Sequence, residues 1–380
     1  MTKIVDTKWI DGIQSTDLKE KLKTYLTDGV LTFDESKQML ISAEQGGMNT
    51  KKLNDLNTVL THSNEIFTDS YAKSITDYVI KGNAANSYWW GGIDNSGKSA
   101  LGNLDDTSSQ GSIEKLVDKW FLGTDVPLPL VGGDAAAGIS GDFEYSYANI
   151  AGSLYKDGVN AADISQGTAG TCFYLAALGA IANANPSLIT NDFIHDNKDG
   201  TYGFRFFNVN GEKSYVTVDT SLAVDENGNP ALATPVGKEL WVSLAEKAYA
   251  QVNAQENVLL RDTAGLNSYQ AVEGGNAEAL KQITGLNYSY YSGENKNVGD
   301  PFSSGTKYSK DPATYKNEII KLLEKGSIGW LGSDMDTTDA NGQTELVAGH
   351  AFMLMGYDSK TDTFKIRNPW GGDNTVDLTI

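Results

Sequence analysis

The sequence predicts an α+β fold, in which helices and antiparallel hairpins occupy separate stretches of one 380-residue chain. Three observations predict this class. The first 85 residues carry short apolar patterns at helical spacing, each ending near a glycine. Two later segments, 203–219 and 350–368, each read as two strands joined by a turn. Between them, residues 239–252 repeat apolar side chains at three–four spacing, which predicts an amphipathic helix.

The composition is that of a globular, acidic chain. Hydrophobic residues make up 40% of it, enough to build ordinary cores. Its 49 acidic and 30 basic side chains leave a net charge of −19, which disfavours nucleic acid and anionic membrane surfaces as partners. We therefore expect a protein or a small molecule as the partner, and no nucleic acid.

The sequence predicts neither a classical sorting signal nor an internal disulfide. The N-terminus has no apolar core of secretory length, and no stretch of about 18 apolar residues predicts a membrane span. The single cysteine cannot form an internal disulfide. Few sulfur residues and many Asn, Gly, Ser and Thr suit a bacterial protein exported without a classical signal peptide. We expect an extracellular location, with the cytoplasm as the alternative.

Residues 1–85 predict an N-terminal helical region. Helices are expected at 17–26 and 34–45, and a longer helical pattern runs from 51 to 80. The turn between the first two resembles part of an EF-hand loop, but its third position would be Leu26, which has no side-chain oxygen for calcium. We predict a helix-turn-helix here, without a metal.

Residues 86–145 read as a Gly/Ser/Asn-rich linker or pro-segment. Two apolar stretches interrupt it, Tyr88-Trp89-Trp90 and 113–122. Two adjacent tryptophans would expose a large apolar area to water in a free linker, so we expect them to dock onto a neighbouring surface. Two interpretations follow: ordinary domain packing, or a pro-segment that covers the active site until it is cleaved.

The single cysteine, Cys172, ends the small-residue segment QGTAGTC, residues 166–172, and enters an apolar run with helical character. Unpaired amides at a helix start favour the thiolate form that a nucleophile needs. A cysteine before an apolar helix also fits a core position. Taken alone, the residue leaves both interpretations open.

The positions of the three histidines favour the interpretation of Cys172 as a nucleophile. Of three, His62 falls in the helical region and His195 in a turn, whereas His350 opens a strand that is followed by a turn and a second strand ending at Asn368. Folding this hairpin about Ser359 sets His350 opposite Asn368. The asparagine oxygen can then accept one imidazole N–H and aim the other nitrogen at sulfur. Trp370 is expected to shield that hydrogen bond.

Four segments in this order resemble the calpain-like branch of the papain-type cysteine peptidases, over roughly residues 161–372. They are the segment ending at Cys172, the ELWV…EKAY helix from Glu239, Gly349-His350-Ala351, and RNPWG from Arg367. The resemblance implies catalytic roles for three residues and an oxyanion role for a fourth. These are Cys172 as nucleophile, His350 as general base and acid, Asn368 as the orienting amide, and Gln166 as oxyanion donor beside the Cys172 backbone N–H.

The resemblance also implies an architecture and a substrate path. A papain-like two-lobe core would occupy 146–380, with a helical lobe at 146–300 and a β lobe at 301–380. Gly274, Gly275 and Gly349 would line a peptide substrate. Two departures are mild: Thr171 stands where calpains commonly have an acidic residue, and Phe173 where tryptophan is frequent. The C-terminal calcium-binding domains of calpains have no counterpart here, so we expect no required cofactor and leave calcium open, with no metal ligand assigned.

Several functions remain to be weighed. The first is a cysteine endopeptidase that acts through a thioester acyl-enzyme and is made as a zymogen with an N-terminal pro-segment. An acyltransferase of transglutaminase type uses a similar triad, with an amine in place of water. A non-catalytic protein-binding module on the same fold is the third, because fold alone does not establish function.

Overall fold

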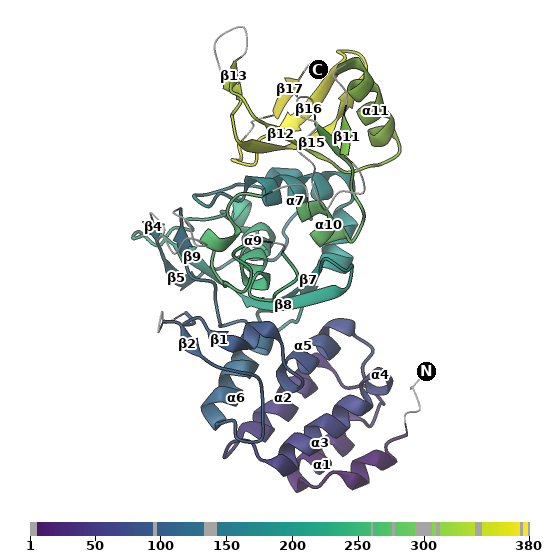
Figure 1. Cartoon of the computed structure of the whole chain (residues 1–380), viewed down its shortest axis with the longest axis vertical. Coiled ribbons are helices and arrows are strands. Elements are labelled where there is room, and N and C mark those ends of the chain that lie inside the picture. The colour runs from purple at the N-terminus through teal and green to yellow at the C-terminus, as the bar shows by residue number, and fades with distance from the viewer. Residues whose placement is uncertain are drawn as a thin grey trace.

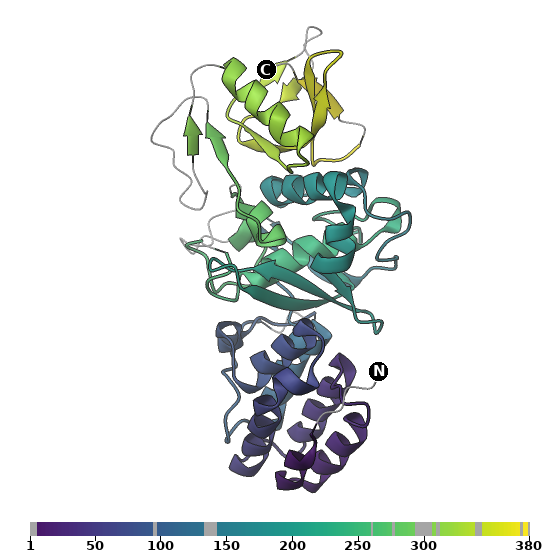
Figure 2. The same cartoon turned by 90° about the vertical axis from the view of Figure 1, so that its right-hand side faces the viewer.

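The computed structural model describes residues 6–93, 97–132, 143–259, 261–275, 278–292, 306–308, 312–338, 344–372 and 375–378. Figure 1 shows three parts stacked along the long axis. The N-terminal helices lie at one end, a mixed unit with α7, α9, β7 and β8 lies in the middle, and an antiparallel sheet with α11 lies at the other end. The view turned by 90° shows the same order (Figure 2). The structure is thus a mixed helix and sheet fold, as predicted.

The first part is mainly helical. Its elements are η1 (Lys8–Gly12), α1 (Thr16–Tyr25), α2 (Phe33–Glu44), α3 (Thr50–Thr61), α4 (Ser63–Ile66), α5 (Ser70–Ile80), η2 (Ala84–Ser87), β1 (Tyr88–Trp89), β2 (Ser99–Ala100), α6 (Gln110–Val117) and η3 (Asp118–Leu122).

Capping side chains set where these helices begin. Thr32 and Glu35 form a reciprocal capping box at the start of α2. The expected long helix over 51–80 is wrong: the structure divides it into α3, α4 and α5. The break before α5 is stabilised by Asp69, whose carboxylate accepts hydrogen bonds from the N–H groups of Tyr71 and Ala72. A local cap therefore overrides the continuous apolar pattern.

The tryptophans of the expected linker are buried, whereas Tyr88 is exposed. Trp90 is 4% exposed, and Trp120 and Phe121 pack into the same core as α1–α5. The indole N–H of Trp120 donates to the Asn86 side chain at 2.6 Å, and the backbone N–H of Trp90 donates to Asp125 at 2.7 Å. The prediction that these aromatics dock onto a neighbouring surface is confirmed.

The middle unit joins helices to several small sheets. Its elements are β3 (Leu130–Val131), β4 (Phe143–Glu144), β5 (Ser146–Asn149), η4 (Ala161–Asp163), α7 (Cys172–Ala184), α8 (Pro186–Leu188), η5 (Ile189–Phe193), β6 (Ile194–Asp196), β7 (Thr201–Phe207), β8 (Lys213–Asp219), β9 (Ser221–Val224), η6 (Val236–Lys238), α9 (Trp241–Val252), η7 (Gln270–Val272) and α10 (Glu278–Thr284). The predicted hairpin around Asn210-Gly211 is confirmed as the antiparallel pair β7–β8.

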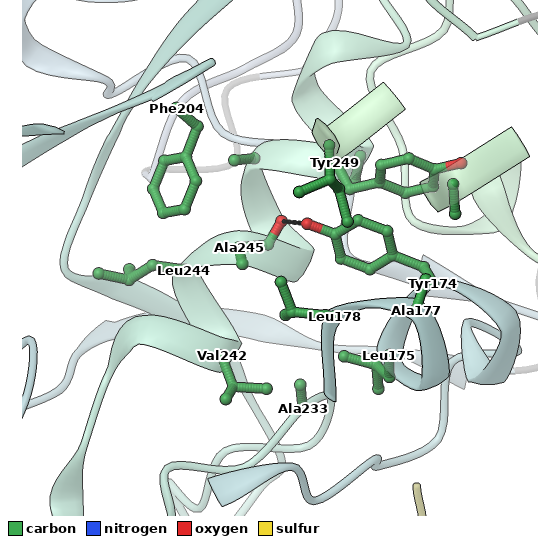
Figure 3. Packing of buried hydrophobic residues seen from close by; sticks show 14 of the residues in the cluster. Tyr174, Leu175, Ala177, Leu178, Phe204, Ala233, Val242, Leu244, Ala245 and Tyr249 are labelled. Atoms are coloured by element: carbon green, nitrogen blue, oxygen red, sulfur yellow. Dashed lines mark hydrogen bonds between the residues drawn. The ribbon is translucent and has the colours of Figure 1, made fainter. Parts of the chain in front are cut away.

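Helices α7 and α9 form the centre of this unit. Figure 3 shows their apolar side chains packed together, with the Tyr174 hydroxyl donating to the carbonyl of Ala245 at 2.9 Å. The expected amphipathic helix is only partly right, because every residue of α9 is buried. Neighbouring elements cover its polar face, where Glu246, Lys247 and Gln251 find partners inside the protein.

The remaining elements are β10 (Tyr290–Ser292), β11 (Thr306–Tyr308), α11 (Pro312–Glu324), β12 (Trp330–Ser333), β13 (Thr337–Thr338), β14 (Thr344–Leu346), β15 (His350–Asp358), β16 (Thr363–Arg367) and β17 (Thr375–Leu378). Strands β12, β15, β16 and β17 make one antiparallel sheet in the order β12-β15-β16-β17. Helix α7 packs against β12 and β15 of this sheet (Figure 1).

The N-terminal helices contact the middle unit on the β8 side, away from α7 (Figure 1). The hydroxyls of Tyr71 and Thr217 form a buried hydrogen bond at 2.7 Å, and Thr217 also donates to the carbonyl of Trp120. Lys37 pairs with Asp199 at 2.6 Å. The described helices of this region therefore lie on the opposite side of the middle unit from His350.

Candidate active site

His350 and Asn368 come together at one end of the sheet. His350 Nε2 lies 2.9 Å from Asn368 Oδ1, and the Trp370 ring lies 4.7 Å from the imidazole, centre to centre. The structure thus brings together the pair that the hairpin predicted. Trp370 keeps half of its surface exposed, so it covers one side of the pair only.

The predicted register of the hairpin is wrong by two residues. The Cα of Met353 lies opposite Arg367, and the ladder shifts between Leu354 and Gly356. His350 and Asn368 are therefore diagonal neighbours, and Asn368 lies just beyond the end of β16. The long turn and the bulge could not be read from the alternation of side chains alone. Diagonal neighbours remain within reach of long side chains, so the pair still meets.

The hydrogen bonds of Asn368 fix the tautomer of His350. The backbone N–H of Trp370, which can only donate, donates to Asn368 Oδ1 at 3.0 Å. The atom facing His350 is therefore an acceptor, and His350 Nε2 carries the proton. In the neutral ring, Nδ1 then keeps a lone pair and is the nitrogen that can take a proton.

Cys172 is the first residue of α7 and is part-buried. Burial raises the pKa of its thiol above the ordinary 9.0, while three nearby backbone N–H groups favour the thiolate and act in the opposite direction. They belong to Ala351, Phe173 and Cys172 itself. Because Ala351 directly follows His350, the sulfur lies beside the first residues of β15.

Burial also lowers the pKa of His350 below the ordinary 6.5, and the hydrogen bond to Asn368 partly offsets this shift. The two shifts favour the same state. At neutral pH, a raised thiol pKa and a lowered imidazole pKa keep both groups uncharged.

Two hydrogen bonds, one from its backbone and one from its side chain, hold Gln166 in place. Its backbone N–H donates to the carbonyl of Pro369 at 2.8 Å, which ties the loop before Cys172 to the residue after Asn368. Its side-chain Nε2 donates to the carbonyl of Ala169 at 2.7 Å. An amide nitrogen has two hydrogens, so one remains for an oxyanion.

The three expected substrate-binding glycines differ in what surrounds them. Gly349 has a φ of +65° and open space where a side chain would stand. Gly274 already uses both backbone groups: its N–H donates to Gly170 at 2.9 Å, and its carbonyl accepts from Arg261. A Cβ at Gly275 would collide with Arg261 and Phe173, so that position has no room for a side chain. Their role in substrate alignment stays a prediction.

Sequence reasoning missed two carboxylates that hold the loop before Cys172. Glu273 accepts from the N–H of Gly170 at 2.9 Å and from the N–H of Gly132 at 2.8 Å. Glu246 accepts from the hydroxyl of Thr171. A signal was available for Glu246, because an acidic residue surrounded by apolar positions on a helix is rarely buried without a partner.

The other histidines lie elsewhere. His62 stacks on Trp9 at 4.5 Å, and His195, expected in a turn, lies in β6 against Tyr71. Within the described ranges, no group of three or more His, Cys, Asp and Glu side chains is arranged to hold a metal ion. Among those same residues, no single helix has the length and apolar character to cross a membrane, although the bent pair Cys172–Ala184 and Pro186–Phe193 passes on length and composition alone.

A family model described as calpain family cysteine protease matches residues 147–376, more than half of the chain. The chain belongs to the calpain family of cysteine proteases. The match contains Cys172, His350 and Asn368, and it begins after the N-terminal helices. The resemblance inferred from four short segments is therefore confirmed.

Curated calpain relatives match the same part of the chain. The calpain-type cysteine protease ADL1 of Oryza sativa subsp. japonica is 29% identical over 233 residues, which cover 58% of this chain and 9% of that protein. The calpain-1 catalytic subunit of Bos taurus is 30% identical over 232 residues, or 57% of this chain and 28% of the relative. The human calpain-2 catalytic subunit is 29% identical over 231 residues, with 56% and 28% covered. The matched segment thus spans less than a third of each of these relatives.

Proposed function

We propose that this calpain-family chain is a cysteine endopeptidase in which Cys172, His350 and Asn368 form the catalytic triad. One observation carries the assignment: His350 donates to Asn368 at 2.9 Å, and the N–H of the next residue, Ala351, lies near enough to Cys172 to affect the pKa of its thiol. Nucleophile, base and orienting amide are thereby joined through adjacent residues. A papain-like two-lobe arrangement, with α7 on one lobe and β15 on the other, is part of this proposal.

The proposed reaction starts from the uncharged pair. The Cys172 sulfur attacks the carbonyl carbon of the scissile peptide bond while its proton passes to His350 Nδ1. The imidazolium then donates that proton to the leaving amine, and a thioester remains on Cys172. Water, deprotonated by His350, hydrolyses the thioester and restores the thiol. Asn368 keeps Nε2 protonated throughout, so Nδ1 is the nitrogen that gains and loses the proton.

The proposed oxyanion donors are the free hydrogen of Gln166 Nε2 and the backbone N–H of Cys172. Both come from the start of α7 and the loop before it, where unpaired N–H groups and the helix dipole favour negative charge. Removing one oxyanion donor commonly lowers kcat about 10²- to 10³-fold. The hydrogen bond from the Gln166 backbone N–H to the Pro369 carbonyl would hold the Gln166 side chain in a fixed position relative to Asn368.

Hydrolysis by the wild type and by C172A tests the proposal. Wild-type protein should cleave casein or a fluorogenic peptide, and C172A should lose at least 10³-fold in kcat/KM. Equal activity in both proteins would exclude Cys172 as the nucleophile.

The same assay separates the alternatives. If an added amine is incorporated faster than the peptide is hydrolysed, the chain is an acyltransferase of transglutaminase type. If a thiol-directed epoxide fails to label Cys172 and no turnover is found, a non-catalytic binding module is favoured. The lone cysteine makes the labelling unambiguous.

We also propose that residues 1–145 stabilise the catalytic unit, with inhibition as the alternative that a zymogen would require. The buried contacts of Tyr71 and Thr217 support the first role. Gly132 supports the second, because it hydrogen-bonds Glu273 beside the loop that precedes Cys172. Turnover by the full chain and by a chain that starts near Asp142 decides between them: faster turnover after truncation indicates inhibition, and unchanged turnover excludes it.

We propose that turnover requires no cofactor, since the three triad side chains supply the nucleophile and the proton transfers. Calcium stays open, with no ligand assigned. Turnover measured after dialysis against a chelator, and again after calcium is restored, tests both points. A loss that calcium reverses would overturn the proposal that no metal is needed.

A further inference from the structure

A buried carboxylate holds the residue that precedes Cys172. Glu246 lies on α9 with 1% of its surface exposed. One of its oxygens accepts from the Thr171 hydroxyl at 2.5 Å, and the other accepts from the N–H of Ala233 at 2.8 Å. Thr171 is fully buried as well. Burying a carboxylate costs free energy unless its hydrogen bonds are strong, and both oxygens here accept one.

Thr171 occupies the N-cap position of α7, but its side chain does not cap the helix. A threonine at this position commonly accepts a hydrogen bond from an N–H of the first turn. Thr171 makes no such bond, because its hydroxyl is turned toward Glu246. The hydroxyl therefore ties Thr171, the residue before Cys172, to α9 and does not cap α7.

The residue before Thr171 is held in a similar way. Glu273, which directly follows η7, accepts from the N–H of Gly170 at 2.9 Å. Carboxylates from two different elements thus fix consecutive residues of the loop. The other titratable groups whose charges interact with Glu246 are Tyr147 on β5, Tyr174 on α7 and Tyr269 before η7. The carboxylate of Glu246 also interacts with that of Glu273. None of these four neighbouring side chains carries a positive charge that would favour the ionised form of Glu246.

We propose that Glu246 is a positioning residue for Cys172: through the Thr171 hydroxyl it holds the residue before Cys172 against α9, and so holds the sulfur at the start of α7. Glu246 touches neither the sulfur nor a substrate. It acts through Thr171, and its effect is on the reactivity of the thiol. The inference rests on the proposed peptidase function, but thiol reactivity can be measured whether or not a peptide is cleaved.

Alkylation of the full-length chain by iodoacetamide measures that reactivity directly, because Cys172 is the sole cysteine. The rate is measured from pH 6 to 10 for the wild type, T171V, T171S and T168V. T171V keeps the shape of the side chain and removes its hydroxyl, and T171S keeps the hydroxyl. Thr168 lies on the same loop, but its hydroxyl donates to the carbonyl of Ala231, so T168V controls for a general disturbance of the loop.

T171V is expected to slow alkylation at pH 7 about tenfold and to move the midpoint of the profile to higher pH, because without the bond to Glu246 the Cys172 sulfur is no longer held at the start of α7, where unpaired N–H groups and the helix dipole favour the thiolate. T171S and T168V should stay within about twofold of the wild type. In peptide hydrolysis, T171V should lower kcat and leave KM unchanged. An unchanged profile for T171V, or equal losses in T171V and T168V, would overturn the inference.

E246Q provides a second, independent variant in case T171V does not fold. The amide oxygen of the new side chain would accept from Ala233, which turns its NH₂ group toward Thr171 and removes the acceptor for the hydroxyl. E246Q should therefore show the same slow alkylation as T171V, and a wild-type rate in folded E246Q would contradict the proposal. If the wild type cleaves no peptide but T171V still slows alkylation, the peptidase assignment fails and the positioning role stands.

Discussion

At the residue scale, the hydrogen bond between His350 and Asn368 determines which nitrogen can act as a base. Asn368 Oδ1 accepts from both His350 and the backbone of Trp370. Two donors hold this oxygen in place, so it in turn holds the imidazole. Removing it should reduce proton transfer and leave substrate binding unchanged.

N368A is expected to lower kcat about 10- to 100-fold with little change in KM, since a hydrogen bond to a charged group, here the imidazolium formed during the reaction, contributes about 1.5–3 kcal/mol. N368D is the matched control, because it keeps an acceptor at the same place. Its carboxylate favours the imidazolium, so the acid limb of the kcat/KM profile should move to higher pH. Steady-state kinetics with one peptide checks both, and a wild-type kcat in N368A would exclude the orienting role.

The ionisation of Cys172 gives a second prediction at this scale. Burial raises the pKa of the thiol above 9.0, so the rate of alkylation of the free protein should rise with pH and reach half of its maximum above pH 9. Burial lowers the pKa of His350, so the acid limb of kcat/KM should fall below pH 6.5. A midpoint for alkylation near neutral pH would indicate a preformed thiolate–imidazolium pair and contradict the uncharged resting state.

At the scale of elements, the contact between α7 and β15 sets the position of Cys172 relative to His350. Gly179 lies in the middle of α7, where a Cβ would collide with the sulfur of Met353 on β15. Met353 is fully buried and belongs to the same core as α7. The helix and the strand are therefore close because this position has no side chain.

G179A should lower the free energy of unfolding by about 1–3 kcal/mol and reduce kcat, because the added methyl must displace the buried Met353 side chain that packs between α7 and β15, the strand that begins at His350. G111A is the matched control: Gly111 lies in α6 with open space around a Cβ. That substitution should stabilise the protein by about 0.4–1 kcal/mol and leave kcat unchanged. Urea unfolding and peptide turnover of both variants test this, and equal stability of G179A and the wild type would contradict the tight contact.

At the scale of the whole molecule, the buried carboxylate of Glu246 should make stability depend on pH. Burial raises its pKa from 4.5 to about 7. Between these values the folded protein keeps a proton that the unfolded chain has released, so the free energy of unfolding falls as pH rises. The contribution amounts to about 3 kcal/mol across the window and is constant above it.

E246Q removes this titration. The difference in unfolding free energy between E246Q and the wild type should therefore shift in favour of E246Q by about 3 kcal/mol from pH 4.5 to 7. His350 titrates in both proteins and cancels in the difference. Urea unfolding at several pH values measures the shift, and parallel profiles would show that Glu246 does not titrate in this range.

The local patterns in the sequence predicted the parts that depend on nearby residues. Gly211 marked the β7–β8 hairpin, and the apolar pattern predicted α1 and α2 to within about two residues. The pairing of His350 with Asn368 was predicted although its register was not, because diagonal neighbours in a hairpin still meet. The continuous apolar pattern over 51–80 failed, since the cap at Asp69 depends on a hydrogen bond that apolar spacing does not reveal.

By itself, the sequence determined the order and chemistry of the site: one cysteine at a helix start, then a histidine and an asparagine on neighbouring strands. Only the tertiary structure decided what surrounds them. Glu246 is 75 residues from Thr171 in the chain, and Glu273 is 103 residues from Gly170, yet both carboxylates hold the loop before Cys172. Such contacts depend on how α9 and η7 pack against α7. Packing between distant elements has no local period in the sequence, so residue spacing could not reveal it.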